Sequence, residues 1–302
     1  MAGTLCRPAP GADTVVVLVP GATYDQTYWN FPYAPDTYNF RLALNRAGYG
    51  TFTLDRLGTG ASSKPLSVLL TSSAQASAIH EVISGLRSGA VGPGFAHLIL
   101  GAHSLGSVEA VVEAATYHDE DALLITGLSH DPNYLSLAAL VADTYPAALD
   151  PLTAKQGYSL IDVGYFTTHP GVRSAHFYGP SYDPNVLAAD EGTKSVYSLA
   201  EPLDGAPLAL ILPTTASIAV PVLIVNGGAD PIFCNSTTCA SSSALRSAEA
   251  PRYGAVPCLS AYVLPDSGHD VNLAPNTALY QNRVLSWLAA LPAQWSGGSC
   301  PA

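Results

Sequence analysis

A serine flanked by small residues lies between an apolar, strand-like run and a helix-like run. In the stretch "LILGAHSLGS", Ser104 occupies the turn, with Ala102 two positions before it and Gly106 two positions after it. A sharp strand–turn–helix that holds up a nucleophile needs small residues at both positions. An ordinary strand-to-helix turn could carry the same residues, so on this evidence Ser104 is a candidate nucleophile and no more.

An aspartate and a histidine that could activate this serine follow later in the chain. "VLIVNGGADPIF" places Asp230 after a strand-like run, and "YVLPDSGHDVNL" places His269 after the next one. A serine hydroxyl becomes a good nucleophile when a histidine removes its proton, and a carboxylate fixes the tautomer of that histidine. Because open parallel sheets build their sites beyond the carboxyl ends of the strands, we expect Ser104, Asp230 and His269 to meet there.

Other acidic residues compete for the role of the orienting carboxylate. Asp131 also follows a strand-like run and is the alternative acid. We favour Asp230 because it lies in the turn-like setting "GGAD". Asp266 and Asp270 flank His269 and are expected to be loop residues.

Strand-like and helix-like runs alternate along most of the chain, which predicts a mostly parallel sheet covered by helices on both faces. The expected strands are residues 14–19, 50–55, 97–102, 121–127, 220–226 and 259–264. Ser72 and Gln75 could form a capping box at one helix start, and Pro275 is expected in the first turn of the final helix. The alternation of strand-like and helix-like runs stops over residues 130–215, which predicts an inserted subdomain with some helices. The expected organisation is therefore a core of residues 1–129 and 216–302 with an insertion of residues 130–215.

These motifs together resemble the α/β-hydrolase superfamily. The order Ser, acid, His agrees with it, and the loop "VPGATYDQTYW" resembles its oxyanion loop, with Pro20 in place of a common histidine. The resemblance implies that the backbone N–H groups of Ala22 and Leu105 bind the oxyanion, and that residues 130–215 form a cap over the site. "LDRLGTGASS" resembles a structural loop of the superfamily, so Asp55 is expected to be structural.

Aromatic residues close to these motifs are candidates for the substrate pocket. Tyr24 and Tyr28 follow the oxyanion loop, and His103 precedes the nucleophile. Tyr24, Tyr28 and His103 are therefore candidate substrate-binding residues, although packing or polar support is the expected role of His103.

Composition limits the partners and cofactors. The 302 residues are 48% apolar and 12% charged, with a net charge of −11. Such an acidic chain is not expected to bind nucleic acid or anionic membranes, which attract basic surfaces. We find no apolar run of the roughly 18–20 residues that a membrane span needs, no phosphate-binding glycine motif and no histidine pair with metal-ligand spacing. We therefore expect no metal and no nucleotide cofactor. The histidines expected to be solvated or buried without a ligand role are His80, His97, His118, His169 and His176.

Five cysteines and a single methionine favour an exported protein. No signal peptide is visible after Met1, so export implies that a signal has been removed. From their places relative to the strands, Cys234 and Cys239 could pair at the site end of the sheet. Cys258 and Cys300 could pair at the opposite end, which leaves Cys6 over.

The sequence therefore predicts a secreted, capped α/β-hydrolase that cleaves a small-molecule carboxylic ester through an acyl-enzyme on Ser104. A lactonase or a thioesterase would use the same residues, and a C–C bond hydrolase is a further alternative. A non-catalytic binding protein on this fold is the alternative outside the enzymes. Either a monomer or a homodimer agrees with the charge.

Overall fold

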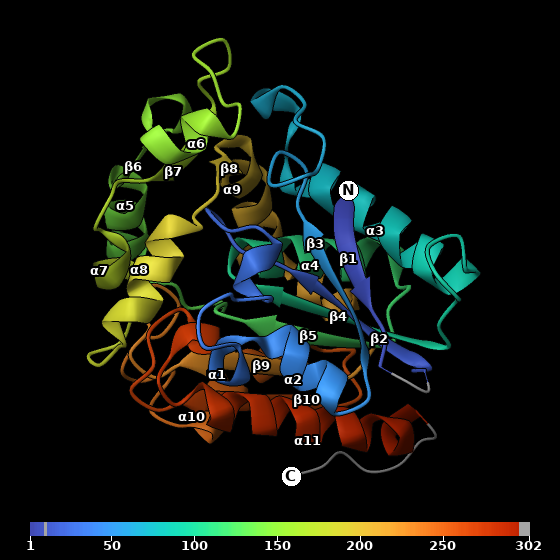
Figure 1. Cartoon of the computed structure of the whole chain (residues 1–302). Helices are drawn as coiled ribbons and strands as arrows, with labels where there is room; N and C mark the ends of the chain where they lie inside the picture. Colours follow the sequence, from blue (N-terminus) through green and yellow to red (C-terminus); the bar gives the residue numbers. More distant parts are fainter. Residues whose placement is uncertain (9–10, 296–302) are drawn as a thin grey trace.

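The structure, a computed structural model, describes residues 1–8 and 11–295 and is built on a seven-stranded sheet of order β1-β3-β2-β4-β5-β9-β10 (Figure 1). All neighbouring strands are parallel except β1, which pairs antiparallel with β3 at the edge. The strands are β1 (Ala2–Cys6), β2 (Thr14–Val19), β3 (Gly50–Asp55), β4 (His97–His103), β5 (Ala122–Thr126), β9 (Val222–Gly227) and β10 (Leu259–Leu264). The predicted α/β class with a mostly parallel sheet is confirmed.

Helices cover both faces of this sheet, which explains why its central strands are buried along almost their whole length. In Figure 1, α2 and α11 lie on one face, and α3 and α4 pack against each other on the other. The helices of the core are α1 (Pro35–Tyr38), α2 (Phe40–Arg46), α3 (Ser72–Ser88), α4 (Leu105–Tyr117), α10 (Ser242–Glu249) and α11 (Thr277–Trp295).

The helix expected from Ser72 begins there, but its expected capping box is not formed, and the final helix begins two residues later than expected. The N-cap of α3 is Thr71, whose side chain accepts the N–H of Ala74, and Ser72 is already helical. Gln75 turns away from the cap and bonds both backbone groups of Leu57, because that loop carries an unpaired donor and acceptor. Pro275 precedes α11, which begins at Thr277.

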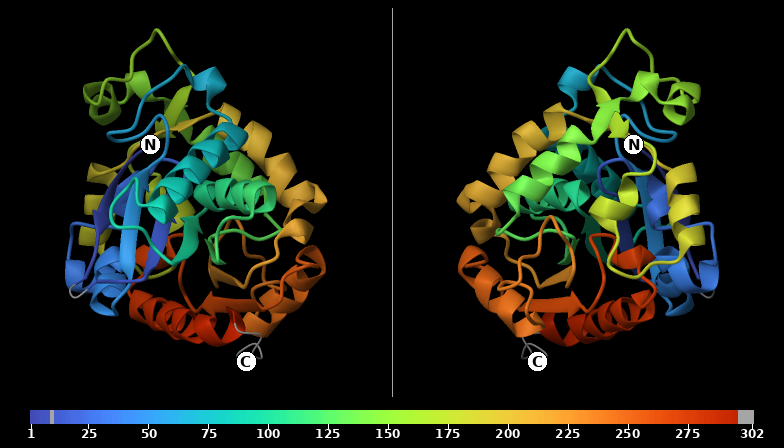
Figure 2. Two further views of the ribbon diagram at one scale, coloured as in Figure 1. Left: turned by 90° about the vertical axis from the view of Figure 1, so that its right-hand side faces the viewer. Right: turned by 90° about the vertical axis from the view of Figure 1, so that its left-hand side faces the viewer.

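The segment between β5 and β9 forms a layer of short helices and a small sheet at one side of the core (Figures 1 and 2). Its three-stranded antiparallel sheet was not expected, because its strands are only two to four residues long. Its helices are α5 (Tyr134–Ala142), α6 (Pro151–Lys155), α7 (Arg173–Phe177), α8 (Pro184–Gly192) and α9 (Ala200–Ala206), and its strands are β6 (Thr144–Pro146), β7 (Tyr165–Thr168) and β8 (Tyr197–Ser198). We call residues 130–215 the insertion.

The Cys234–Cys239 disulfide is present, as predicted, in the loop that follows β9, and Cys6 is free. Cys300 lies outside the described residues, so its pairing with Cys258 stays a prediction. None of the helices in the described ranges is long and apolar enough to cross a membrane.

Candidate active site

Ser104 lies in a sharp turn between β4 and α4, with its backbone in the left-handed region at φ 52°. Residues other than glycine seldom adopt this conformation, and functional sites are where such strain concentrates. At Gly106, an added Cβ would approach the carbonyl oxygen of Pro20 to 2.5 Å. The small residue that the sequence indicated at this position is therefore a steric requirement of the turn.

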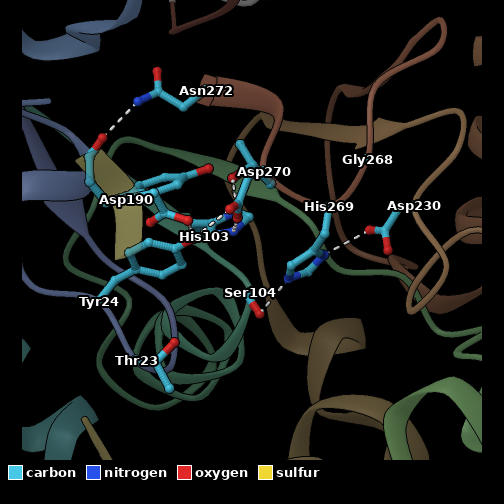
Figure 3. A network of polar contacts seen from close by, with 12 residues as sticks. Thr23, Tyr24, His103, Ser104, Asp190, Asp230, Gly268, His269, Asp270 and Asn272 are labelled. Carbon is cyan, nitrogen blue, oxygen red and sulfur yellow. Dashed lines mark hydrogen bonds and ion pairs between the residues drawn. The ribbon is translucent and has the colours of Figure 1, made fainter. Parts of the chain in front are cut away.

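The structure brings Ser104, His269 and Asp230 into one hydrogen-bonded chain (Figure 3). His269 Nε2 lies 2.8 Å from Ser104 Oγ, and His269 Nδ1 lies 2.8 Å from Asp230 Oδ2. The other carboxylate oxygen of Asp230 accepts the backbone N–H groups of Ile232 and Phe233 at 2.7 and 3.1 Å. The acid is thus held by its own loop with one oxygen directed at the histidine.

The pKa values of Asp230 and His269 are shifted in the directions that suit a histidine acting as a base. Burial alone would raise the pKa of Asp230, but His269 and the two backbone donors hold it below its ordinary value. Burial alone would lower the pKa of His269, but the Asp230 carboxylate raises it above the ordinary 6.5. An ionised Asp230 therefore stabilises the imidazolium that forms when His269 accepts the serine proton.

The alternative acid, Asp131, does not reach His269. Its carboxylate accepts the side chains of Asn235 and Thr238 instead. Its neighbour His130 pairs with Glu249 at 2.6 Å. Among the acids weighed from the sequence, Asp230 is the one bonded to the histidine.

Two backbone N–H groups beside Ser104 are free to receive a substrate oxygen. Leu105 begins α4, so its N–H has no acceptor within the helix. Neither Leu105 N–H nor Ala22 N–H makes a hydrogen bond to another described residue, and both residues line the cavity at Ser104. The Ser104 N–H itself is taken by the carbonyl of Thr126 at 2.8 Å. Both N–H groups are therefore unpaired at the cavity wall, and their role as oxyanion donors stays a prediction.

Arg56, a residue to which the sequence assigned no role, fixes the loop that carries Ala22. Its guanidinium is fully buried and donates to the carbonyl of Gly21 at 3.2 Å. Because a trans peptide directs its C=O and N–H in opposite directions, holding the Gly21 carbonyl turns the Ala22 N–H the other way. Arg56 is neutralised by Glu109 and Glu201 at 3.0 and 2.6 Å. In the sequence, Glu109 interrupts the mostly apolar run "SVEAVV". A lone acidic residue in such a run was the one signal that it pairs with a buried cation.

The three aromatic candidates occupy different places. Tyr24 lines the cavity beside Ser104, whereas Tyr28 and His103 are buried and absent from its wall. His103 stacks on Tyr28 with ring centres 4.5 Å apart. Tyr28 therefore does not line the cavity as expected, and both residues pack behind the nucleophile turn, which for His103 is the packing role that the sequence favoured.

Asp270, expected to be an ordinary loop residue, is instead the centre of a buried polar network (Figure 3). It accepts the hydroxyl of Tyr24 and lies 3.1 Å from His103 Nε2. The Thr126 hydroxyl lies 3.0 Å from His103 Nδ1 and 2.9 Å from the carbonyl oxygen of Ala102. A neutral His103 with its hydrogen on Nε2 donates to the Asp270 carboxylate, and the other tautomer pairs with a protonated Asp270. Burial raises the pKa of Asp270 to about 6 and lowers that of His103, which disfavours the charged form of each group.

The same network reaches a buried ion pair of the insertion, because the Tyr24 hydroxyl also lies 3.4 Å from Asp190 Oδ2. Arg173 holds Asp190 with two hydrogen bonds of 2.8 Å, and its third nitrogen donates to Thr23 Oγ1 at 2.9 Å. The backbone carbonyl of Thr23 accepts the N–H of Ser195. Thr23 lies next to Ala22 and has a strained φ of 60°. The insertion therefore helps to fix the backbone next to Ala22, whose N–H is the predicted oxyanion donor.

Comparison with known proteins decides the family. The family model described as "Alpha/beta hydrolase family" matches residues 16–281. The chain belongs to the alpha/beta hydrolase family. No curated protein sequence matches it.

Solved structures similar to this alpha/beta hydrolase agree in fold at low sequence identity. An enol-lactonase from Burkholderia xenovorans superposes with a TM-score of 0.65 at 16% identity, over 95% of this chain and 96% of that one. A putative aryl esterase from Burkholderia cenocepacia gives 0.62 at 15% identity, over 96% and 94%. A monoacylglycerol lipase from Paleococcus ferrophilus gives 0.59 at 16% identity, over 96% and 100%. At this identity the likeness concerns the fold.

The cavity of this alpha/beta hydrolase is apolar. Apart from the triad members Ser104 and His269, its polar side chains are two threonines and two tyrosines, and no charged side chain of the described residues lines it. Half of its wall comes from the insertion, including Leu137 and Leu140 of α5 and Tyr197 of β8. The hydrogen-bonded Ser104 and His269 and the unpaired N–H groups of Ala22 and Leu105 thus lie at a pocket whose wall favours apolar groups.

Proposed function

We propose that this alpha/beta hydrolase cleaves carboxylic esters with an apolar acyl group through an acyl-enzyme on Ser104. One observation carries the proposal: the hydrogen-bonded chain from Ser104 through His269 to Asp230 ends in an apolar cavity. The insertion acts as a cap that supplies half of the pocket wall. An esterase, a lipase and a lactonase among similar structures support the same class of reaction.

Acylation follows from the arrangement of the triad. Ser104 Oγ attacks the ester carbonyl carbon while its proton passes to His269 Nε2. The carbonyl oxygen becomes negative and receives the N–H groups of Ala22 and Leu105, each donor being worth about 10²–10³ in rate. The carbon–oxygen bond to the alcohol then breaks, and His269 returns the proton to the leaving oxygen. Asp230 stays ionised throughout.

Deacylation repeats these steps with water. His269 removes a proton from water as its oxygen attacks the acyl carbon, and the same two N–H groups receive the oxyanion. Collapse releases the carboxylic acid and returns the proton to Ser104 Oγ. A strongly apolar wall favours an acyl group without charge, because a carboxylate or ammonium buried there would lack a partner.

The test is covalent labelling followed by turnover. A fluorophosphonate should add once to the wild type by intact mass and not to Ser104→Ala. Ser107→Ala is the matched control, because Ser107 lies three residues after Ser104, in the first turn of α4, but bonds the backbone of Thr126 and is absent from the cavity wall. Labelling of Ser104→Ala, or p-nitrophenyl ester turnover that survives in it, would refute the proposal.

A panel of substrates then distinguishes the alternatives. p-Nitrophenyl esters of increasing acyl length, lactones and thioesters share one nucleophile but differ in leaving group. We expect the highest kcat/KM on an ester with an apolar acyl group. If kcat/KM for a lactone or a thioester exceeds that for the best ester by more than about tenfold, the substrate belongs to that other class and the triad assignment stands. Tenfold in kcat/KM is about 1.4 kcal/mol of transition-state binding.

We also propose that the chain acts outside the reducing cytosol. The Cys234–Cys239 disulfide and the low methionine content support this location. Alkylation and intact mass of protein from its native source test it. Two free thiols at Cys234 and Cys239 would contradict it.

A further inference from the structure

Three side chains of metal-ligand type converge between α3 and α4, away from the triad. His80 comes from α3, Glu113 from the last turns of α4, and Asp119 from the loop that follows. One ligand atom from each lies within 4.8 Å of the others. His80 Nδ1 is already 2.6 Å from Asp119 Oδ2, and its ring is stacked on Tyr117 with centres 4.1 Å apart.

The Glu113 carboxylate has no partner that would stabilise its charge. The residue is fully buried, and neither of its oxygens receives a hydrogen bond from any described residue. Oδ1 of Asp119 is also buried without a donor among the residues that the structure describes. A buried carboxylate in such a setting needs either a proton or a cation.

We propose that His80, Glu113 and Asp119 bind one divalent transition-metal ion and that Zn²⁺ is the ion that fits best. The bound ion links α3 to α4. One imidazole nitrogen with two carboxylate oxygens and no thiolate is a donor set that suits Zn²⁺. Ligand bonds of about 2.0–2.2 Å in a tetrahedron place ligand atoms about 3.4 Å apart, so the three residues need only small shifts.

Charge and access favour a metal ion over a proton at this place. Two carboxylates balance the charge of the ion, and the carboxyl end of α4 adds the negative end of the helix dipole. The side chains of His80 and Asp119 are 30% and 19% exposed, which gives the ion a path from solvent. The sequence did not predict the site, because only the packing of α3 on α4 brings the ligands together.

The site is structural in this proposal. Glu113 follows the start of α4 by eight residues, which is about 12 Å along the helix axis. The ion would therefore stabilise the helix pair without reaching the oxyanion donor at Leu105. We expect binding to change the melting temperature and to leave ester turnover unchanged.

The experiment uses the whole, tag-free chain after EDTA treatment and dialysis. Zn²⁺ should bind at one ion per chain by elemental analysis. At about 100 times its dissociation constant, it should raise the melting temperature by about 4 °C for a domain of this size. Ca²⁺ and Mg²⁺ at the same concentration should raise it less. A larger response to Ca²⁺ or Mg²⁺ would overturn the assignment of an imidazole ligand.

Variants separate this site from adventitious binding. His80→Gln and Glu113→Gln should lose the Zn²⁺ response. His97→Gln should keep it, because His97 is a comparably exposed histidine 3.9 Å from a single carboxylate. Equal responses in all variants, or no response in the wild type, would mean that Glu113 is neutralised by a proton. If Glu113→Gln does not fold, the partly exposed His80→Gln decides the question alone.

Discussion

Replacing Asp230 by asparagine tests the triad at the residue for which the sequence left an alternative. The two backbone N–H groups of Ile232 and Phe233 hold one carboxylate oxygen, so the amide oxygen of the new side chain would take that place. Its NH₂ group then faces His269 Nδ1. A donor at that position favours the tautomer with hydrogen on Nε2, which cannot accept the proton of Ser104.

The expected loss in kcat/KM is about 10³–10⁴. An imidazolium and a carboxylate whose charges lie about 4 Å apart attract each other by about 4 kcal/mol at an effective dielectric constant of about 20. That energy corresponds to about 10³ in rate, since each 1.36 kcal/mol or so is tenfold. The wrong tautomer of His269 accounts for the remainder.

The pH profile supplies a second readout of the same change. His269 is inactive as a base when protonated, so kcat/KM falls as the pH drops through its pKa. Asp230 raises that pKa, so the acid limb of the wild type should lie above pH 6.5. In Asp230→Asn the raising partner is gone and burial remains, which should move the limb to lower pH.

Hydrolysis of a p-nitrophenyl ester from about pH 5 to 9, a range that brackets the ordinary histidine pKa, measures both quantities. Asp131→Asn is the control, because the Asp131 carboxylate accepts Thr238 and does not touch His269. Asp131→Asn should keep the wild-type rate and the wild-type position of the acid limb of the pH profile. An Asp230→Asn enzyme with nearly the wild-type rate, or an equal loss in Asp131→Asn, would refute the reasoning.

Three further changes test the surroundings of the triad. Asp270→Asn should keep most activity, because an amide can donate to His103 Nε2 while its oxygen accepts Tyr24, whereas Asp270→Leu should lose stability by urea denaturation; equal stability of the two would contradict a role of these hydrogen bonds in folding. Arg173→Leu should cost about 3–5 kcal/mol of unfolding free energy, because it leaves a buried carboxylate unpaired, and a loss below about 1 kcal/mol would contradict the importance of the ion pair. Cys239→Ser opens a short disulfide loop and should cost about 2 kcal/mol; thermal unfolding measures it, and no change would show that the loop is held by other contacts.

The sheet and the triad could be predicted because their signals are local. Strands β2, β3 and β10 have the predicted ends, since each is a short run rich in apolar, aromatic or β-branched residues that loop residues bound. The position of Ser104 follows from the steric demands of one turn. Asp230 and His269 follow from the rule that parallel strands end at the same edge of the sheet.

The polar network could not be predicted because its partners are far apart in sequence. Asp270 meets His103 across 167 positions, and Arg56 meets Glu201 across 145. The periodicity of apolar residues along the sequence gives no signal of pairs so far apart. The edge strand β1 was missed for a different reason: it is short and half exposed, so it lacks the apolar run that marks the central strands.

The contact of Arg173 with Thr23 limits how this enzyme can be re-engineered. Exchanging the insertion for that of a relative would change half of the pocket wall, which makes it an attractive graft for altering substrate choice. The graft would also remove the guanidinium that braces the strained Thr23 backbone next to Ala22. A chimera would therefore gain a new pocket and lose an anchor for its oxyanion loop, unless the donor segment carries an arginine and an aspartate at the same places. If the proposed function holds, the wall that selects the substrate and the brace of the oxyanion loop are therefore exchanged together.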